Sequence, residues 1–173
     1  MKTLSVIPAR GASKGVPGKN IKELDGKPLL AYTVEAAKAS SKIDRLILSS
    51  DDEKIIQLAK DFDIEVPFVR PAELSQDESS SLEVVQHAIH FFESQGDHYD
   101  AVVLLQVTSP FRQKGFIDEA VKKFQDGDFD SLVSVLPVPH EYNPHWVFEP
   151  DKNNVLKIAT GDEAIIKRRQ ELP

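Results

Sequence analysis

The chain has 173 residues, a length typical of one domain that can build a hydrophobic core. Its formal net charge of −7 argues against a nucleic-acid polymer as the main partner, because binding to its backbone needs a broad basic face; a local basic loop can still hold a small phosphate ligand. The absence of cysteine excludes disulfides, thiolate nucleophiles and zinc–cysteine sites, and it fits a reducing cytoplasm.

Apolar strands and amphipathic helices alternate along the chain. Strands are predicted at residues 3–9, 44–50, 64–70, 99–106 and 130–138. Helices are predicted at residues 26–40, 50–62, 79–96 and 113–127. Pro67 places the third strand at a sheet edge, because proline cannot donate to a ladder. The order predicts an α/β fold with a Rossmann-like, mostly parallel sheet and helices on both faces.

The most apolar run, at 99–106, is expected to be a central strand buried on both faces. After Pro137 the sequence becomes rich in proline and asparagine, with short strand-like pieces. We therefore expect a nucleotide-binding α/β core at 1–137 and an extension at 138–173. No stretch reaches the ~20 apolar residues of a membrane span, and the N-terminus lacks a signal-peptide pattern, so we expect a cytoplasmic protein.

The loop after the first strand, "ARGASKGVPGKN" at 9–20, combines small residues with positive charge. Its glycines are Gly11, Gly15 and Gly18, and its cations are Arg10, Lys14 and Lys19. Backbone amides and a few cations after a strand form a concave anion site, which suits a triphosphate. The spacing matches neither a Walker A loop nor a dinucleotide fingerprint. The loop alone leaves a second interpretation open, a solvated turn whose lysines only aid solubility.

Five segments in order then carry a family resemblance. They are "IPARGASKGVPGKNIKELDGKPLLAYTVEAA", "RLILSSDDEKI", "VPFVRPAELSQDESSSLEVVQHAI", "VVLLQVTSPFR" and "RRQELP". Together they resemble the acylneuraminate (CMP-sialic acid synthetase) family of cytidylyltransferases over almost the whole chain. Ala12 replaces a glycine often seen in the family loop, and Val107 stands where the family often has proline. The resemblance implies a GT-A-like nucleotidyltransferase that transfers CMP from CTP to the anomeric hydroxyl of a nonulosonic acid and releases pyrophosphate.

The resemblance also implies roles for individual residues. Lys19 and Arg10 are expected to be the catalytic cations, with Lys19 near the α-phosphate. Nucleotide binding is expected of Arg10, Gly11, Ala12, Ser13, Lys14, Lys19, Asn20, Arg70, Ser81 and Gln106. Sugar binding is expected of Gln106, Thr108, Ser109, Arg168 and Arg169. Because ligands of open parallel sheets bind at the carboxyl ends of strands, the glycine loop and the turn after 106 should face one crevice.

Several polar residues in these segments and beyond them also have a purely structural interpretation. Arg70 and Arg112 can be surface charges, since arginine is usually exposed. Ser81 can be a helix N-cap, and Arg168 with Arg169 can be a charged tail. Asp51 and Asp52 at a helix start are interpreted as capping acids rather than metal ligands. His145 is interpreted as a packing or surface residue rather than a metal ligand.

The resemblance further implies Mg²⁺ as the cofactor and a homodimer formed through residues 138–170. The family's metal-binding acids lie beyond position 173, so no metal ligand is assigned within the chain. We therefore expect a C-terminally shortened form of the enzyme, and the sequence leaves open whether this form is active. One alternative is a related nucleotidyltransferase with another acceptor, such as 3-deoxy-manno-octulosonate. The other is a non-catalytic nucleotide-binding fragment. The sequence does not distinguish sialic, legionaminic and pseudaminic acids.

Overall fold

A computed structural model describes residues 1–12, 15–139, 142–166 and 171. The chain forms two compact units, Met1–Leu132 and Val133–Pro173. The division that the sequence predicts after residue 137 stays a prediction. Among the described residues, no helix has the length and apolar character needed to cross a bilayer.

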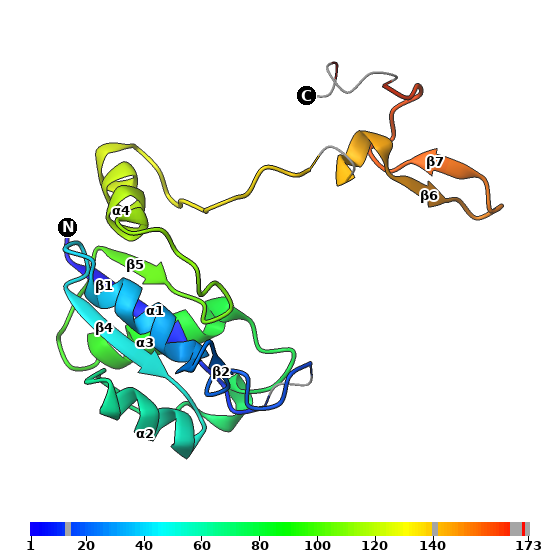
Figure 1. Cartoon of the computed structure of the whole chain (residues 1–173). Coiled ribbons are helices and arrows are strands. Elements are labelled where there is room, and N and C mark those ends of the chain that lie inside the picture. Colours follow the sequence, from blue (N-terminus) through cyan, green and yellow to red (C-terminus); the bar gives the residue numbers. More distant parts are fainter. Residues whose placement is uncertain (13–14, 140–141, 167–170, 172–173) are drawn as a thin grey trace. The chain divides into compact units, whose positions relative to one another are not determined.

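The first unit is built on a parallel sheet with strand order β4-β1-β5 (Figure 1). β1 spans Thr3–Pro8, β4 spans Arg45–Ser49 and β5 spans Ala101–Leu104. β1 is buried from its first residue to Ile7, because it has a strand on each side and helices over both faces. The predicted α/β fold with a mostly parallel sheet is confirmed.

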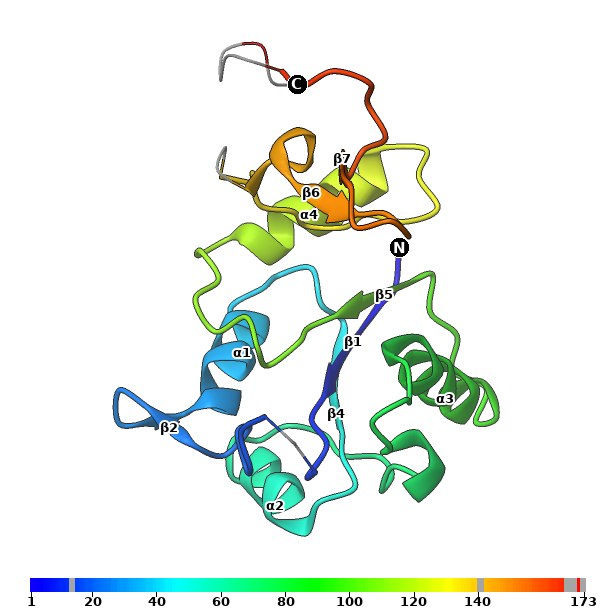
Figure 2. The same ribbon diagram turned by 90° about the vertical axis from the view of Figure 1, so that its right-hand side faces the viewer.

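Four α-helices cover this sheet. They are α1 (Leu29–Lys38), α2 (Glu53–Asp61), α3 (Ser81–Glu93) and α4 (Phe116–Asp126). Alternate residues of β1 point to opposite faces, so Ile7 packs with α1, α2 and α4 while Leu4 and Val6 pack with α3. Figure 2 shows α1 and α3 on opposite sides of the strands. Helices on both faces are therefore confirmed.

Two predictions about strands were wrong near the end of this unit. β5 is an edge strand rather than the centre, because no described segment pairs with its outer side, and its last residue, Leu104, is exposed. Residues 131–138 form no strand, although they are apolar. Val133, Val135 and Leu136 are exposed. An apolar run becomes a strand only beside a hydrogen-bonding neighbour, and the described residues offer it none.

The predicted strand at 64–70 is reduced to a single parallel bridge between Ile47 and Glu65. Pro67 lacks the N–H that a continuous ladder needs, which explains why the pairing stops. The structure also has a short hairpin that the sequence analysis missed, formed by β2 (Glu23–Leu24) and β3 (Lys27–Pro28) at the start of the predicted 26–40 helix. Its turn is Asp25-Gly26, with φ of 52° and 72°, which is the Asp-Gly signal of a tight hairpin.

The second unit contains one antiparallel hairpin. β6 (Phe148–Pro150) pairs with β7 (Leu156–Ile158), as the strand-like pieces of the sequence indicated. A short 3-10 helix, η3 (Pro144–Trp146), precedes it, and Asn143 caps that helix through the amide of His145 at 3.1 Å. His145 also contacts Asp162, with 2.6 Å between Nδ1 and Oδ2.

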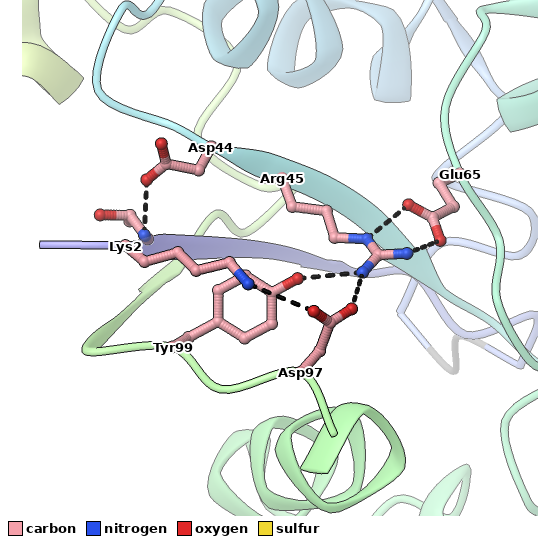
Figure 3. Close-up of polar contacts among 7 residues, drawn as sticks. Lys2, Asp44, Arg45, Glu65, Asp97 and Tyr99 are labelled. Atoms are coloured by element: carbon pink, nitrogen blue, oxygen red, sulfur yellow. Dashed lines mark hydrogen bonds and ion pairs between the residues drawn. The ribbon is translucent and has the colours of Figure 1, made fainter. Parts of the chain in front are cut away.

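An ionic cluster closes the N-terminal end of the sheet in the first unit (Figure 3). Arg45 donates two hydrogen bonds to Glu65, at 2.8 and 2.7 Å, and one each to Asp97 at 2.8 Å and the Tyr99 hydroxyl at 3.1 Å. Its guanidinium also lies 4.2 Å from the centre of the Phe92 ring. The bonds to Glu65, then to Tyr99, raise the pKa of Arg45 above its usual value. This cluster links the start of β4 to the segments around Glu65 and Asp97, at the edge of the sheet opposite the glycine loop.

Candidate functional site

The three strands end at one edge of the sheet because they are parallel. The glycine loop follows β1 there, the turn 49–52 follows β4, and the turn 105–112 follows β5. Ligands of open α/β sheets bind at this edge. The sheet thus brings to one edge most of the predicted site residues that the structure describes. Ser13, Lys14, Arg168 and Arg169 lie outside the described residues.

Asn20 links the two ends of the glycine loop, and this residue is only 4% exposed. Its Nδ2 donates to the carbonyl of Arg10 at 2.9 Å, and its own carbonyl accepts from the amide of Leu30 at 2.9 Å. Gly18 has a φ of +64°, and its carbonyl accepts from the amide of Ile21 at 3.1 Å. Asn20 therefore shapes the loop from inside.

The turn after β4 contacts the loop directly. The amide of Gly11 donates to Asp51 Oδ1 at 3.0 Å. Asp52 caps α2 by accepting from the amides of Lys54 and Ile55 at 2.9 and 3.0 Å, which confirms the capping interpretation for Asp52. Asp51 instead bonds the loop. A Cβ on Gly11 would lie 2.6 Å from Asp52 Oδ2 and 2.8 Å from Asp52 Cβ, so the close approach needs glycine.

Arg70 lies beside this turn and is 5% exposed, so its interpretation as a surface charge was wrong. Its Nε donates to Ser49 Oγ at 3.0 Å, and its Nη2 donates to the Ser49 carbonyl. The pKa of Arg70 is lowered to about 10, chiefly by burial; the charge of Asp51 raises it and the charge of Arg10 lowers it. Arg70 remains a cation at neutral pH, held rigidly at the site.

The two cations of the loop that the structure describes differ in their surroundings. Arg10 Nη2 lies 2.7 Å from Asp77 Oδ1, and Nη1 donates to the Gln76 carbonyl at 2.7 Å. Lys19 is half-buried, and its side chain makes no hydrogen bond or ion pair with any residue that the structure describes. The sequence analysis missed Asp77, because no local pattern marks an acid whose partner is far along the chain.

Ser81 is the first residue of α3 but not its cap, so its interpretation as an N-cap was wrong. Ser80 is the cap, because its Oγ accepts from the Glu83 amide at 3.2 Å. Glu83 completes a capping box by accepting from the Ser80 amide at 2.7 Å, and that bond comes first among the causes that lower the pKa of Glu83. The half-buried hydroxyl of Ser81 is thus not needed to cap α3.

His87 is a second residue that the sequence analysis missed. Its buried Nδ1 has no hydrogen-bond partner among the residues that the structure describes, and its ring meets Phe68 edge-on with 4.5 Å between ring centres. Burial, followed by the charge of Arg70, lowers the pKa of His87, so the neutral ring is favoured. No spacing in the sequence singles out this histidine within α3.

The turn after β5 presents exposed polar side chains. Gln106, Thr108 and Ser109 are all exposed. The half-buried Arg112 fixes this turn, because its Nη2 donates to the Gln106 carbonyl at 2.7 Å and its Nη1 donates to Thr33 Oγ1 on α1 at 3.0 Å. Arg112 is therefore a structural tie rather than a surface charge, and burial lowers its pKa.

The described residues do not provide a metal centre. They contain no group of three or more His, Cys, Asp or Glu side chains placed to hold a cation. Magnesium prefers carboxylate oxygens and water, often with phosphate oxygens of the substrate. The residues that the structure describes therefore do not fit a protein-built Mg²⁺ site, and the cofactor stays a prediction.

Taken together, this edge of the sheet is suited to binding an anion. It offers a glycine loop whose ends are linked by Asn20, together with three cations. These are the buried Arg70, Arg10 in an ion pair, and Lys19, whose side chain has no partner among the described residues. Such a set of fixed cations and backbone amides can hold a polyphosphate and stabilise charge that develops on it.

Sequence comparisons agree with this chemistry. The family model described as "Cytidylyltransferase" matches residues 4–173. A pseudaminic acid cytidylyltransferase of Campylobacter jejuni is 40% identical over 171 residues, covering 99% of this chain and 72% of that protein. A CMP-N,N'-diacetyllegionaminic acid synthase of Legionella pneumophila is 37% identical, covering 91% of this chain and 67% of that protein. An N-acylneuraminate cytidylyltransferase of Escherichia coli is 37% identical over 86% of this chain and 34% of that protein.

Solved structures support the fold. A CMP:2-keto-3-deoxy-manno-octonic acid synthetase complexed with CTP matches with a TM-score of 0.61 and 22% identity, over 73% of this chain. A cytidylyltransferase from Leptospira borgpetersenii matches with a TM-score of 0.57 and 21% identity, over 74% of this chain. The chain spans about half the length of these structures, 48% and 50%.

The resemblance seen in the sequence is confirmed, and so is the expected enzyme class: the chain belongs to the cytidylyltransferase family of nucleotidyltransferases.

Proposed function

We propose that the chain transfers CMP from CTP to the anomeric hydroxyl of a nonulosonic acid, with release of pyrophosphate. The observation that carries this proposal is the family match over residues 4–173, together with the relatives named for pseudaminic, legionaminic and acylneuraminic acids. In this reaction the hydroxyl oxygen forms a bond to the α-phosphorus while the bond to the pyrophosphate oxygen breaks. The proton of the hydroxyl passes to solvent.

The site supports this reaction through charge and position. Nucleotidyl transfer needs neutralisation of the polyphosphate and alignment of the attacking oxygen more than covalent help. Lys19 makes no described side-chain bond, so it is free to meet the α-phosphate, and Arg70 adds a buried positive charge nearby. Gln106 and Ser109, exposed beyond β5, are proposed to contact the sugar acid or the ribose.

The remaining expectations belong to the same proposal. We place the protein in the cytoplasm, where CTP is available, and we expect a homodimer through residues 138–170, part of which lies outside the described residues. Mg²⁺ is expected to arrive with CTP, since triphosphates bind it through their own oxygens. A 3-deoxy-manno-octulosonate acceptor stays the second candidate from the sequence analysis. The matching synthetase for that sugar, at 22% identity, supports the fold alone.

The test compares Lys19→Ala with Lys22→Ala, a matched control at an exposed lysine of the same segment. Pyrophosphate release is measured with CTP, Mg²⁺ and a panel of nonulosonic acids plus 3-deoxy-manno-octulosonate. We expect Lys19→Ala to lower kcat by about 100-fold, the usual loss of one group that stabilises developing charge, and Lys22→Ala to stay near wild type.

Three results would change the proposal. A near-normal rate in Lys19→Ala would remove this lysine from the reaction. A strict preference for ATP or UTP over CTP would overturn the cytidylyl assignment. Calorimetric binding of CTP, with no release of pyrophosphate from CTP in the presence of any of the sugar acids, would favour the nucleotide-binding fragment instead.

A further inference from the structure

Asp51 places a negative charge where a triphosphate is expected to bind. A carboxylate at such a position repels the ligand, so the charge needs a compensating role. The neighbouring Asp52 has a clear structural task, because it caps α2. Asp51 takes no part in that cap and instead accepts the amide of Gly11 at 3.0 Å. Its role therefore lies in the contact between the turn 49–52 and the glycine loop.

Asp51 also acts on a second element of the site. Its charge stabilises the cationic form of Arg70, whereas the charge of Arg10 disfavours it. Two arginines near one another repel, and burial of Arg70 makes that repulsion costly. A carboxylate close to Arg70 offsets part of this cost before any ligand arrives.

We infer that Asp51 is a positioning residue of the nucleotide site. It fixes the Gly11 amide in the loop, so this amide is oriented before the triphosphate binds. This preorganisation lowers the cost of ordering the loop on binding, which is where affinity is gained. The inference rests on the proposed function for the identity of the ligand.

A metal-ligand role for Asp51 is the competing explanation. Oδ1 already accepts an amide hydrogen bond, and the described residues contain no group of three acidic or histidine side chains that could share a cation with it. The two explanations predict different behaviour for asparagine, which can accept the Gly11 bond but is a poor ligand for Mg²⁺.

The test uses Asp51→Ala, Asp51→Asn and the control Asp52→Asn. Asparagine is a good N-cap, so the control removes a neighbouring charge and keeps the α2 cap. By calorimetry with CTP and Mg²⁺, we expect Asp51→Ala to raise Kd by about 10-fold, the loss expected for one charge-assisted hydrogen bond. Asp51→Asn should stay within about 3-fold of wild type, because the acceptor is kept. Asp52→Asn should bind CTP as the wild type does.

A second readout needs no ligand. Hydrogen exchange of the Gly11 amide in the nucleotide-free protein should be slow in the wild type and in Asp51→Asn, and at least about 10-fold faster in Asp51→Ala. The Ile47 amide, inside β4, reports whether the fold is intact. A wild type that fails to bind CTP would sink the proposed function, while this exchange measurement would still report on the loop contact.

Two outcomes would overturn the inference. One is unchanged CTP affinity and unchanged Gly11 exchange in Asp51→Ala. The other is a loss in Asp51→Asn as large as in Asp51→Ala, accompanied by weaker dependence on Mg²⁺, which would make Asp51 a metal ligand.

Discussion

The contact between Gly11 and Asp52 allows a sharp test of how the glycine loop is held. In Gly11→Ala, the new Cβ would lie 2.8 Å from Asp52 Cβ and 2.6 Å from Oδ2, whereas ordinary contacts begin at 3.4 Å. Gly11 is not among the residues with positive φ, so the expected strain comes from this clash alone. One of the two segments must therefore move by more than half an ångström, since 3.4 − 2.8 = 0.6 Å.

Either movement breaks a hydrogen bond. If Asp52 retreats, the cap of α2 weakens, which costs about 0.5–2 kcal/mol. If the loop retreats, the bond from the Gly11 amide to Asp51 lengthens from 3.0 Å and the loop loses its orientation. We expect Gly11→Ala to lower the free energy of unfolding by about 1–2 kcal/mol and to weaken CTP binding by about 10-fold.

Urea denaturation and CTP calorimetry measure these effects, with Gly15→Ala as the matched control. A Cβ on Gly15 meets no atom of the described residues within 4 Å, so that variant should keep the wild-type values. Asp52→Gly removes the clashing atoms at a cost of only a few tenths of a kcal/mol to the cap, so Gly11→Ala should cost less in its presence. Equal stability and affinity of Gly11→Ala and Gly15→Ala would refute the reasoning.

Two further predictions concern stability. Arg45→Leu removes a bidentate, partly exposed ion pair with Glu65 and the contact with the Phe92 ring, so it should lower the free energy of unfolding, measured in urea, by about 1–2 kcal/mol. If the losses of Arg45→Leu and Glu65→Gln simply add in the double variant, the two side chains are not directly coupled. Burial lowers the folded-state pKa of His87 below its ordinary 6.5, so the unfolded chain binds the proton first as pH falls. Stability should therefore rise from about pH 5 to about pH 7, and His87→Gln should flatten this rise in urea midpoints measured across that range.

The periodicity of the sequence predicted the four α-helices and the three strands of the parallel sheet. The four α-helices and the strands at 3–8, 45–49 and 101–104 lie within the predicted ranges. The failures share one cause. The segments 64–70 and 130–138 are apolar enough to be strands, but a strand exists only through a neighbour, and a single sequence does not show which neighbour is present. The Asp25-Gly26 turn is different, since its signal was in the sequence and was overlooked.

The candidate site divides in the same way. Arg10 and Lys19 could be found from the sequence because a glycine-rich, cationic loop after a strand has a physical reason to bind phosphate. The acids that hold the loop could not be found in this way. Asp77, which pairs with Arg10, and Asp51, which accepts from the Gly11 amide, reach the loop only after the chain has folded back on the sheet. The same folding buries Arg70, for which the sequence alone left a surface position open as the alternative to a role in nucleotide binding. A loop motif therefore predicts the sign of charge that the ligand carries. The acids that hold the loop in place are instead determined by the order of the strands in the sheet. Mutating these acids therefore tests the fold and the function together.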